Sequence, residues 1–184
     1  MMGDKKSVVL NILSMSHKHL CDINKPNEPF LIFGKLIPSF INGQWTWTEE
    51  IYEIPYEKWY PNDELDYSEY IDNPDKIVYM AYVGNQCIGQ IRLRRNWNQY
   101  CYIEDIAVSR QYRGMGLGRR LIDIAIQWAK NGEMQGLMAE TQDTNLAACR
   151  FYHRCGFVLG GVDIMLYRNC SNSDEKALLW YKLF

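Results

Sequence analysis

The chain has 184 residues, the size of one globular domain, and 47% of them are hydrophobic, which is enough for a substantial core. Its 20 basic and 22 acidic residues give a formal net charge of -2, so no overall positive field exists to attract nucleic acid or anionic lipid. The six cysteines form no CxxC pair, which excludes a thioredoxin-like motif or a local zinc framework. We therefore expect a single cytoplasmic domain with reduced thiols that binds neither nucleic acid nor membrane.

No targeting segment and no metal centre are expected. The apolar stretch from Val8 to Leu13 is interrupted by Asn11 and is too short for the core of a secretory signal. No later apolar run approaches the roughly 18 residues that cross a membrane. His17 and His19 have no third ligand near them in the sequence, so the three histidines of the chain do not predict a metal site.

The segment from Glu49 to Asp75 is strongly acidic. It holds ten Asp and Glu residues against a single basic residue, Lys58, and tryptophan and tyrosine side chains are interleaved with these acids. Two interpretations are open. The segment is either a solvated helical face that turns its aromatic side chains into the core, or the wall of an acidic, aromatic-lined cleft for a cationic substrate.

A strand-rich region begins after residue 76. Ile77–Val83 and Cys87–Leu93 predict two antiparallel strands joined by a Gly-Asn turn. Tyr100–Val108 predicts a third strand, with Glu104 and Asp105 in its middle. Because side chains alternate across a strand, these two acids point to opposite faces unless a bulge intervenes. At least one of them is expected to line a cleft.

A glycine-rich loop then leads into a helix that is predicted to end near Lys130. Without Cβ atoms the loop can gather backbone N–H groups at the positive end of the helix, which makes a pocket for a pyrophosphate. The loop lacks the Lys-Ser/Thr pair of a Walker motif and the GxGxxG spacing of a dinucleotide fingerprint. A glycine-rich turn without a ligand remains the alternative. The loop comprises Arg113, Gly114, Met115, Gly116, Leu117, Gly118 and Arg119.

The region from residue 100 to 167 resembles the GNAT N-acetyltransferase superfamily. The segment Arg113-Gly-Met-Gly116-Leu-Gly118, preceded by Ile106-Ala107-Val108, is similar to the acetyl-CoA loop of that superfamily. Downstream, Asn145 is followed by Phe151-Tyr152 and by Cys155-Gly156-Phe157, which resembles the second half of the superfamily pattern. The resemblance implies an α/β (α+β) fold, with a mixed, mainly antiparallel sheet of about seven strands flanked by helices.

The likeness extends to the streptothricin N-acetyltransferases over nearly the full chain. The stretches that carry it are Lys25–Phe30, Phe33–Glu49, Asn96–Asn98, Glu140–Asp143, Gly161–Asp163 and Met165–Tyr167. This resemblance implies one domain, residues 1–184, in which residues 1–76 form the acceptor side and residues 77–184 the acetyl-CoA-binding core. It further implies transfer of an acetyl group from acetyl-CoA to an amino group in the β-lysine part of streptothricin, directly and through a tetrahedral intermediate, with inactivation of the antibiotic.

The chemistry of this reaction assigns roles to particular residues. A carboxylate, Glu104 in preference to Asp105, would accept a proton from the amine, either directly or through water. The resemblance implies that a backbone N–H near Val108 supports the oxyanion and that Tyr152 protonates the leaving thiolate, although Tyr152 could also be a core aromatic. Asn145 caps a helix, binds the pantetheine arm, or does both. The residues expected to hold acetyl-CoA are Ile106, Ala107, Val108, Arg113, Gly114, Met115, Gly116, Leu117, Gly118, Arg119, Asn145 and Phe151.

Acidic side chains are the expected partners of the substrate, because streptothricin is cationic. The candidates are Asp63, Glu64, Asp66, Glu140 and Asp163. Two other functions stay open: acetylation of another small cationic amine, such as an aminoglycoside or a polyamine, and a GNAT module that binds acyl-CoA without turnover. The apolar segment Ala177–Phe184 is expected as an edge strand that pairs with another subunit or closes the sheet, so a monomer and a homodimer are both possible.

Overall fold

Residues 10 to 184 are described by a computed structural model, and their centre is one seven-stranded sheet. All neighbouring strands are antiparallel except β6 and β7, which confirms the mixed, mainly antiparallel sheet that the sequence predicts. In spatial order the strands are β1 (Leu10–Ser14), β4 (Lys76–Val83), β5 (Gln86–Arg95), β6 (Cys101–Val108), β7 (Gly136–Gln142), β9 (Ala177–Leu183) and β8 (Val158–Asp163). The start of the apolar stretch at Val8 lies outside the described residues. Within residues 10–184, no helix has the length and apolar character needed to span a membrane.

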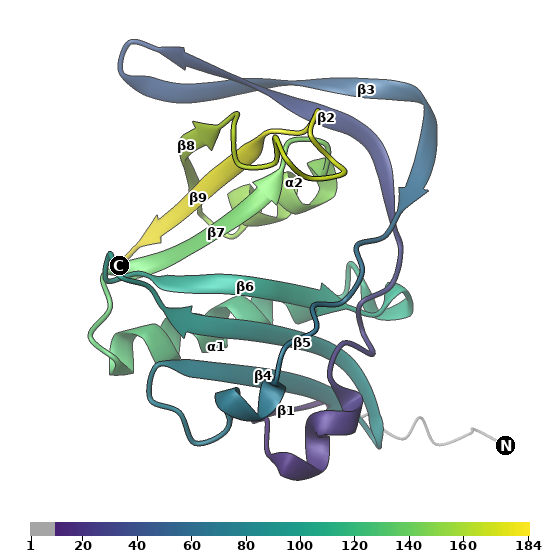
Figure 1. Cartoon of the computed structure of the whole chain (residues 1–184), viewed down its shortest axis with the longest axis vertical. Coiled ribbons are helices and arrows are strands. Elements are labelled where there is room, and N and C mark those ends of the chain that lie inside the picture. The colour runs from purple at the N-terminus through teal and green to yellow at the C-terminus, as the bar shows by residue number, and fades with distance from the viewer. Residues whose placement is uncertain (1–9) are drawn as a thin grey trace, which may run out of the picture.

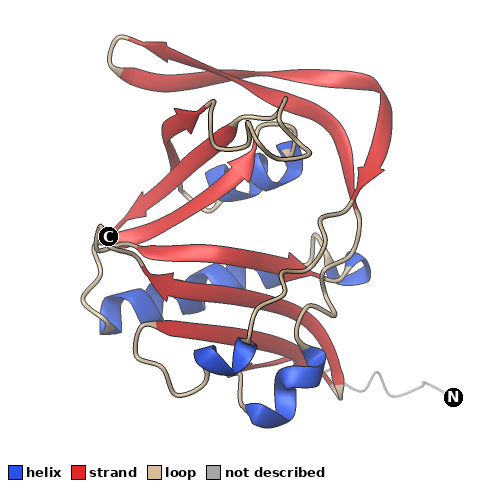
Figure 2. Ribbon diagram, in the orientation of Figure 1, coloured by secondary structure: helices blue, strands red, loops and turns tan. Residues whose placement is uncertain are grey.

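Two α-helices complete the core. Helix α1 (Leu117–Asn131) buries one apolar stripe, including Leu121 and Ala125, against β5, β6 and β7, and Figure 2 shows it running behind these strands. Helix α2 (Leu146–Arg154) contacts β2. Short 3-10 helices are η1 (His17–Asp22), η2 (Tyr67–Tyr70) and η3 (Arg110–Tyr112).

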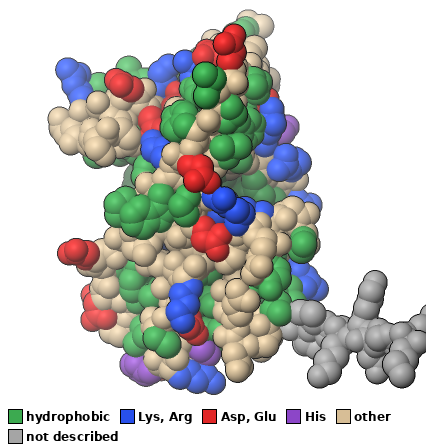
Figure 3. Space-filling model, turned by 90° about the vertical axis from the view of Figure 1, so that its right-hand side faces the viewer, with side chains coloured by type: hydrophobic (Ala, Val, Ile, Leu, Met, Phe, Trp, Pro, Cys, Tyr) green, Lys and Arg blue, Asp and Glu red, His purple; other side chains and the backbone are tan. Residues whose placement is uncertain are grey.

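A long two-stranded arm spans the upper part of the molecule in Figure 1. It consists of β2 (Phe30–Ile41) and β3 (Gln44–Lys58), paired antiparallel around a tight turn. The helical interpretation of Glu49–Asp75 is therefore wrong, because its first part continues β3. Side chains alternate along this part of the strand: Trp45 and Trp47 turn inward and pack against the core, while Thr46 and Thr48 face outward. Hydrophobic side chains also gather on the surface in the upper part of Figure 3, where Figure 1 has the arm.

The C-terminal strand is not at an edge of the sheet, contrary to the sequence prediction. Strand β9 lies between β7 and β8, and its residues Leu178 and Trp180 are fully buried. The edges are β1 and β8. The strand is strongly apolar because it is paired on both sides. Since β1 pairs with β4, residues on both sides of position 76 also share the same sheet.

The sheet divides between β6 and β7. These parallel strands pair only over Cys101–Ile103 and Leu137–Ala139, and Figure 1 shows them diverging beyond that point. The edge of β6 that faces β7 is therefore unpaired from Glu104 onward. This divergence leaves a wedge in the middle of the sheet, and the functional side chains gather there.

Candidate active site

A cavity of about 780 Å³ occupies the wedge between β6 and β7. Its walls come from both strands, from the beginning of α1, from α2, and from the loops around residues 24–30 and 60–67. Of the residues singled out from the sequence, it is lined by Asp63, Glu104, Asp105, Ile106, Ala107, Val108, Arg113, Gly114, Gly116, Gly118, Arg119, Glu140, Asn145, Phe151 and Tyr152.

A β-bulge at Glu104 brings both central acids of β6 to the same face. Arg92 pairs with Asp105, but the next residue, Leu93, pairs with Ile103, so Glu104 is the extra residue. The side chains of Glu104 and Asp105 accordingly both reach the row formed by alternate residues of β5. The sequence left open whether one or both acids line a cleft, and in the structure both do.

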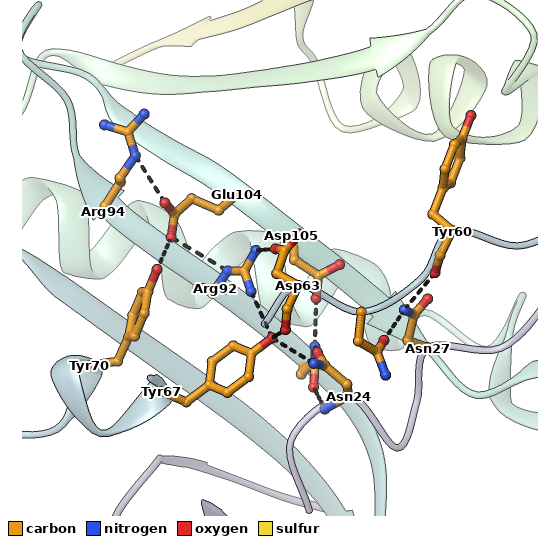
Figure 4. A network of polar contacts seen from close by, with 12 residues as sticks. Asn24, Asn27, Tyr60, Asp63, Tyr67, Tyr70, Arg92, Arg94, Glu104 and Asp105 are labelled. Atoms are coloured by element: carbon orange, nitrogen blue, oxygen red, sulfur yellow. Dashed lines mark hydrogen bonds and ion pairs between the residues drawn. The ribbon is translucent and has the colours of Figure 1, made fainter. Parts of the chain in front are cut away.

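Glu104 is held by three partners, as Figure 4 shows. Its carboxylate lies 3.0 Å from Arg94 Nε and 3.5 Å from Arg92 Nε, and the hydroxyl of Tyr70 donates to it at 2.6 Å. Burial raises the pKa of Tyr70, and the bond to Glu104 raises it further. Arg92 Nη2 also pairs with Asp63 at 2.7 Å. The arginines thus neutralise much of the acidic charge on this wall.

Asp105 has an amide partner. Gln90 Nε2 donates to Asp105 at 2.6 Å and to Asn24 Oδ1 at 2.8 Å, while the N–H of Asn24 donates to Gln90 Oε1. Burial raises the pKa of Asp105, and the bond from Gln90 and the charge of Arg92 partly oppose this shift. The network fixes the Asp105 carboxylate and joins the N-terminal loop to the sheet (Figure 4).

The glycine loop presents unpaired backbone donors to the cavity. Gly114 and Gly116 have φ of 76° and 85°, which is the left-handed region that favours glycine. Gly116 is the N-cap of α1, so the helix begins where the loop ends. Within residues 10–184, no acceptor takes the N–H groups of residues 114 to 119, while the N–H of Arg120 already bonds inside the helix. The positive end of α1 therefore offers several free donors to an anion.

Other predicted loop residues have different surroundings. Arg113 Nε donates to the carbonyl of Val108 at 2.8 Å, and Arg119 Nη1 donates to the carbonyl of Arg154 at 2.9 Å. Both side chains thus fix the loop while they line the cavity. Met115 is 74% exposed and Leu117 is buried in the core, and neither side chain lines the cavity.

The backbone N–H of Val108 faces the cavity side of β6. The next residue, Ser109, donates its N–H to the carbonyl of Ile88 on β5. Successive N–H groups in a strand point in opposite directions, so the N–H of Val108 points away from β5. Because β7 has diverged there, this donor opens into the wedge.

Tyr152 lies on α2, and Asn145 is the N-cap residue of that helix. Tyr152 is 4% exposed and lies edge-on to Phe151 and Phe157, yet it lines the cavity. Among the described residues, nothing hydrogen-bonds its hydroxyl, which is not sealed from solvent either. Burial, followed by the charge of Asp105, raises the pKa of Tyr152. Asn145 caps α2 by accepting the N–H of Ala148, and it lines the cavity as well.

Three of the five predicted substrate acids lie outside the cavity lining. Asp66 caps η2 by accepting the N–H of Ser68, and Asp163 accepts the N–H groups of Met165 and Leu166 in a turn. Glu64 is exposed beside Asp63 but does not line the cavity. Asp63 and Glu140 remain as the predicted substrate acids in the cavity.

Sequence reasoning did not select several lining residues. Arg92 could have been found from the sequence, because it alternates with Arg94 on one face of a predicted strand. Two neighbouring carboxylates that are both ionised are expected to have a cation beside them, and Arg92 pairs with Asp63 and Glu104. Asn24 and Tyr60 come from irregular loops. No periodicity marks such residues, and only the tertiary fold brings them to the wedge.

Comparison with known proteins agrees with this geometry. The model of the acetyltransferase (GNAT) family matches residues 44–157. Streptothricin acetyltransferase A of Bacillus subtilis (strain 168) is 49% identical over 94% of this chain and 99% of its own length. A streptothricin acetyltransferase of Escherichia coli is 38% identical over 69% of this chain and 70% of its own length.

A solved structure is similar over almost the whole chain. It is a Bacillus anthracis protein, assigned as a streptothricin acetyltransferase and crystallised with acetyl coenzyme A. It has a TM-score of 0.87 and 42% identity, and the match covers 96% of this chain and 98% of that chain. Likeness of this extent, in sequence and in structure, shows that the chain belongs to the GNAT acetyltransferase family.

Proposed function

We propose that this protein transfers the acetyl group of acetyl-CoA to an amino group of streptothricin and thereby inactivates the antibiotic. The similar proteins named as streptothricin acetyltransferases, one of which covers nearly the whole chain, support this substrate. We further propose that the amine belongs to the β-lysine part of the molecule. The six cysteines are free in the structure, which suits a reducing cytoplasm.

The glycine loop fits the pyrophosphate of acetyl-CoA. Its free N–H groups at the beginning of α1 match a doubly charged phosphate group, and Arg113 and Arg119 add positive charge nearby. Phe151 on α2 and the N-cap residue Asn145 line the continuation of the same cavity. When bound there, acetyl-CoA supplies the activated acetyl group as a thioester.

The rest of the cavity suits a cationic amine. It carries the carboxylates of Asp63, Glu104, Asp105 and Glu140, together with the aromatic rings of Tyr60 and Tyr67. The two arginines of β5 neutralise only part of this charge. Carboxylates and aromatic faces attract ammonium groups, and both occur here on a half-buried surface.

Three groups of the chain serve the transfer. The N–H of Val108 donates to the thioester oxygen as negative charge develops on it. The hydroxyl of Tyr152 donates a proton to the departing thiolate. A carboxylate must accept a proton from the amine, because an alkyl ammonium with a pKa near 10 is almost fully protonated at neutral pH. The carboxylates on the two strands that border the wedge are Glu104, Asp105 and Glu140.

One observation carries the proposal: the free N–H groups of the glycine loop and the carboxylates of Asp63, Glu104, Asp105 and Glu140 open into the same cavity. The test is thiol release from acetyl-CoA by purified protein with streptothricin, an aminoglycoside, spermidine or no acceptor. We expect turnover with streptothricin and a product heavier by one acetyl group. Turnover only with another amine would overturn the substrate, and saturable acetyl-CoA binding without turnover on any amine would favour a binding module.

A further inference from the structure

Glu140 occupies the wall of the wedge that faces Glu104 and Asp105. It lies on β7 just beyond Ala139, the last residue of that strand that pairs with β6. Its side chain is half-buried and lines the cavity together with that of Gln142, two residues further along the same face. Glu140 therefore borders the wedge where the strands begin to separate.

Glu140 differs from the other cavity carboxylates in its partners. Asp63 and Glu104 pair with arginines, Asp105 accepts the amide of Gln90, and Glu28 accepts the backbone N–H of Arg110. Within residues 10–184, Glu140 pairs with no cation and accepts no N–H. Its hydrogen bond comes from the phenol of Tyr167, which in turn accepts Gln142 Nε2 at 3.1 Å. Glu140 thus keeps accepting capacity that the structure leaves unused.

The groups that face Glu140 are phenols and one further carboxylate. Its charge contributes, after burial, to the raised pKa values of Tyr60, Tyr102 and Tyr152, which come from the β3–β4 loop, from β6 and from α2. Tyr167 faces it from the loop after β8. The other carboxylate is Glu175, which Lys58 neutralises at 2.5 Å.

These surroundings disfavour a charged carboxylate. Burial, followed by the charge of Glu175, raises the pKa of Glu140 to about 7. A carboxyl group with such a pKa is part ionised at neutral pH and can both accept and release a proton. The four tyrosines around Glu140 also suit an ammonium group.

We propose that Glu140 is the proton acceptor for the reacting amine, an inference that rests on the acetyl transfer proposed above. The ammonium of the acceptor gives one proton to the Glu140 carboxylate and becomes a neutral amine. The amine nitrogen then bonds to the acetyl carbon, and the C–S bond breaks. Tyr152 gives its proton to the thiolate and regains one from the nitrogen as the amide forms. Glu140 releases its proton to solvent, so the net products are the amide, free CoA and one proton.

This assignment replaces Glu104 as the preferred base. The carboxylate of Glu104 is shared by Arg92, Arg94 and Tyr70, so both of its oxygen atoms are already engaged by donors of the protein, unlike those of Glu140. Asp105 suits the role of a base better, because burial raises its pKa. However, Gln90 and the charge of Arg92 stabilise its ionised form. In this assignment, Glu104 and Asp105 serve to hold the cationic substrate.

The test compares Glu140→Gln, Glu104→Gln and Asp105→Asn in the full chain, with saturating streptothricin, between pH 6 and pH 9. In the wild type, kcat should fall as the pH drops through about 7, because the carboxylate becomes protonated. Glu140→Gln should lower kcat at pH 7 by about 100-fold and remove the plateau of kcat that the wild type reaches above pH 7. Its kcat should instead rise by about tenfold per pH unit with the fraction of neutral amine.

Two further results separate catalysis from folding. Glu140→Gln should bind acetyl-CoA as the wild type does, and Glu140→Asp should recover part of kcat together with the plateau. A plateau of kcat above pH 7 in Glu140→Gln, or loss of that plateau in Glu104→Gln or Asp105→Asn instead, would overturn the inference. Absence of wild-type turnover on streptothricin is a different outcome, because it would refute the proposed function on which the inference rests.

Discussion

Gly118 lies so close to Phe151 that a Cβ atom at position 118 would stand 2.9 Å from the edge of the phenyl ring. The third glycine of the loop is therefore required by packing, whereas Gly114 and Gly116 are required by their positive φ. Phe151 also lines the cavity, so this contact couples the start of α1 to the position of α2.

Replacing Gly118 with alanine should displace the ring of Phe151. We expect a loss of about 1–3 kcal/mol of folding free energy from overpacking and a higher KM for acetyl-CoA. Thermal unfolding and initial-rate kinetics measure the two effects. The matched variant is Gly118→Ala with Phe151→Leu, in which the smaller side chain relieves the contact. Strictly additive effects of the two substitutions would show that the residues are not coupled.

Tyr152→Phe removes the proposed proton donor and preserves the packing of the ring against Phe157. We expect kcat to fall by about 100-fold or more, while the KM for acetyl-CoA and the thermal unfolding temperature change little. Steady-state kinetics and a thermal melt give both quantities. Full kcat in the variant would identify Tyr152 as a core aromatic without a catalytic role.

Tyr167→Phe should change the pH dependence of the reaction. The hydroxyl of Tyr167 donates to the Glu140 carboxylate and stabilises its charged form. Its removal should raise the pKa of Glu140 above its value of about 7, so the acid limb of kcat should move to higher pH. A profile of kcat between pH 6 and pH 9 measures this shift, and movement in the opposite direction would contradict the assigned hydrogen bond.

Asp63 should contribute to substrate affinity. It lines the cavity and is held by Arg92, whereas the neighbouring Glu64 lies outside the cavity lining. Asp63→Asn should raise the KM for streptothricin by about threefold to tenfold, and Glu64→Gln should leave it unchanged. Neither substitution should alter the KM for acetyl-CoA. Equal effects of both substitutions would indicate a diffuse attraction of the acidic segment rather than a specific contact.

Glu175 should make folding stability depend on pH. The carboxylate is 7% exposed and accepts from Lys58, Tyr60, Thr144 and Asn172. Burial alone would raise its pKa, but these hydrogen bonds outweigh burial and lower the pKa below 4.5. The stability that Glu175 contributes is therefore present above pH 4.5 and is lost as the pH falls through the lowered pKa.

Urea unfolding of the wild type and of Glu175→Gln measures this contribution. At pH 7 the variant should be less stable by about 3–5 kcal/mol, because the ammonium of Lys58 loses its partner. As the pH falls through the lowered pKa of Glu175, the difference should become smaller, since the wild-type carboxylate then gains a proton. A difference that does not change with pH would assign the effect to packing alone.

The sequence predicts the central sheet and the glycine loop because their signals are local. Short runs of apolar and aromatic residues bounded by turn residues mark β4 to β6, and a helical stripe of apolar residues marks α1. The arm of β2 and β3 is missed because its acids mask the alternation of Trp45 and Trp47. The position of β9 is missed because an apolar strand looks alike at an edge and in the interior.

The site is predictable only in part for a related reason. Glu104 and Asp105 stand out as acids inside a strand, but their shared face depends on a bulge that the residue types do not mark. The protonation and hydrogen bonding of Glu140 depend on Glu175 and Tyr167, which follow it in the sequence by more than twenty residues. Burial and charge at such a position arise from tertiary packing, and a sequence pattern does not report them.

The short pairing between β6 and β7 has a mechanical consequence. Among residues 10–184, strand pairing between the four strands on one side of the wedge and the three on the other is confined to Cys101–Ile103 and Leu137–Ala139. The sheet therefore consists of two leaves joined along a short seam, and each ligand that enters the wedge contacts both leaves. A bound ligand supplies the cross-links that the diverging strands lack, so binding should slow amide hydrogen exchange in both leaves together.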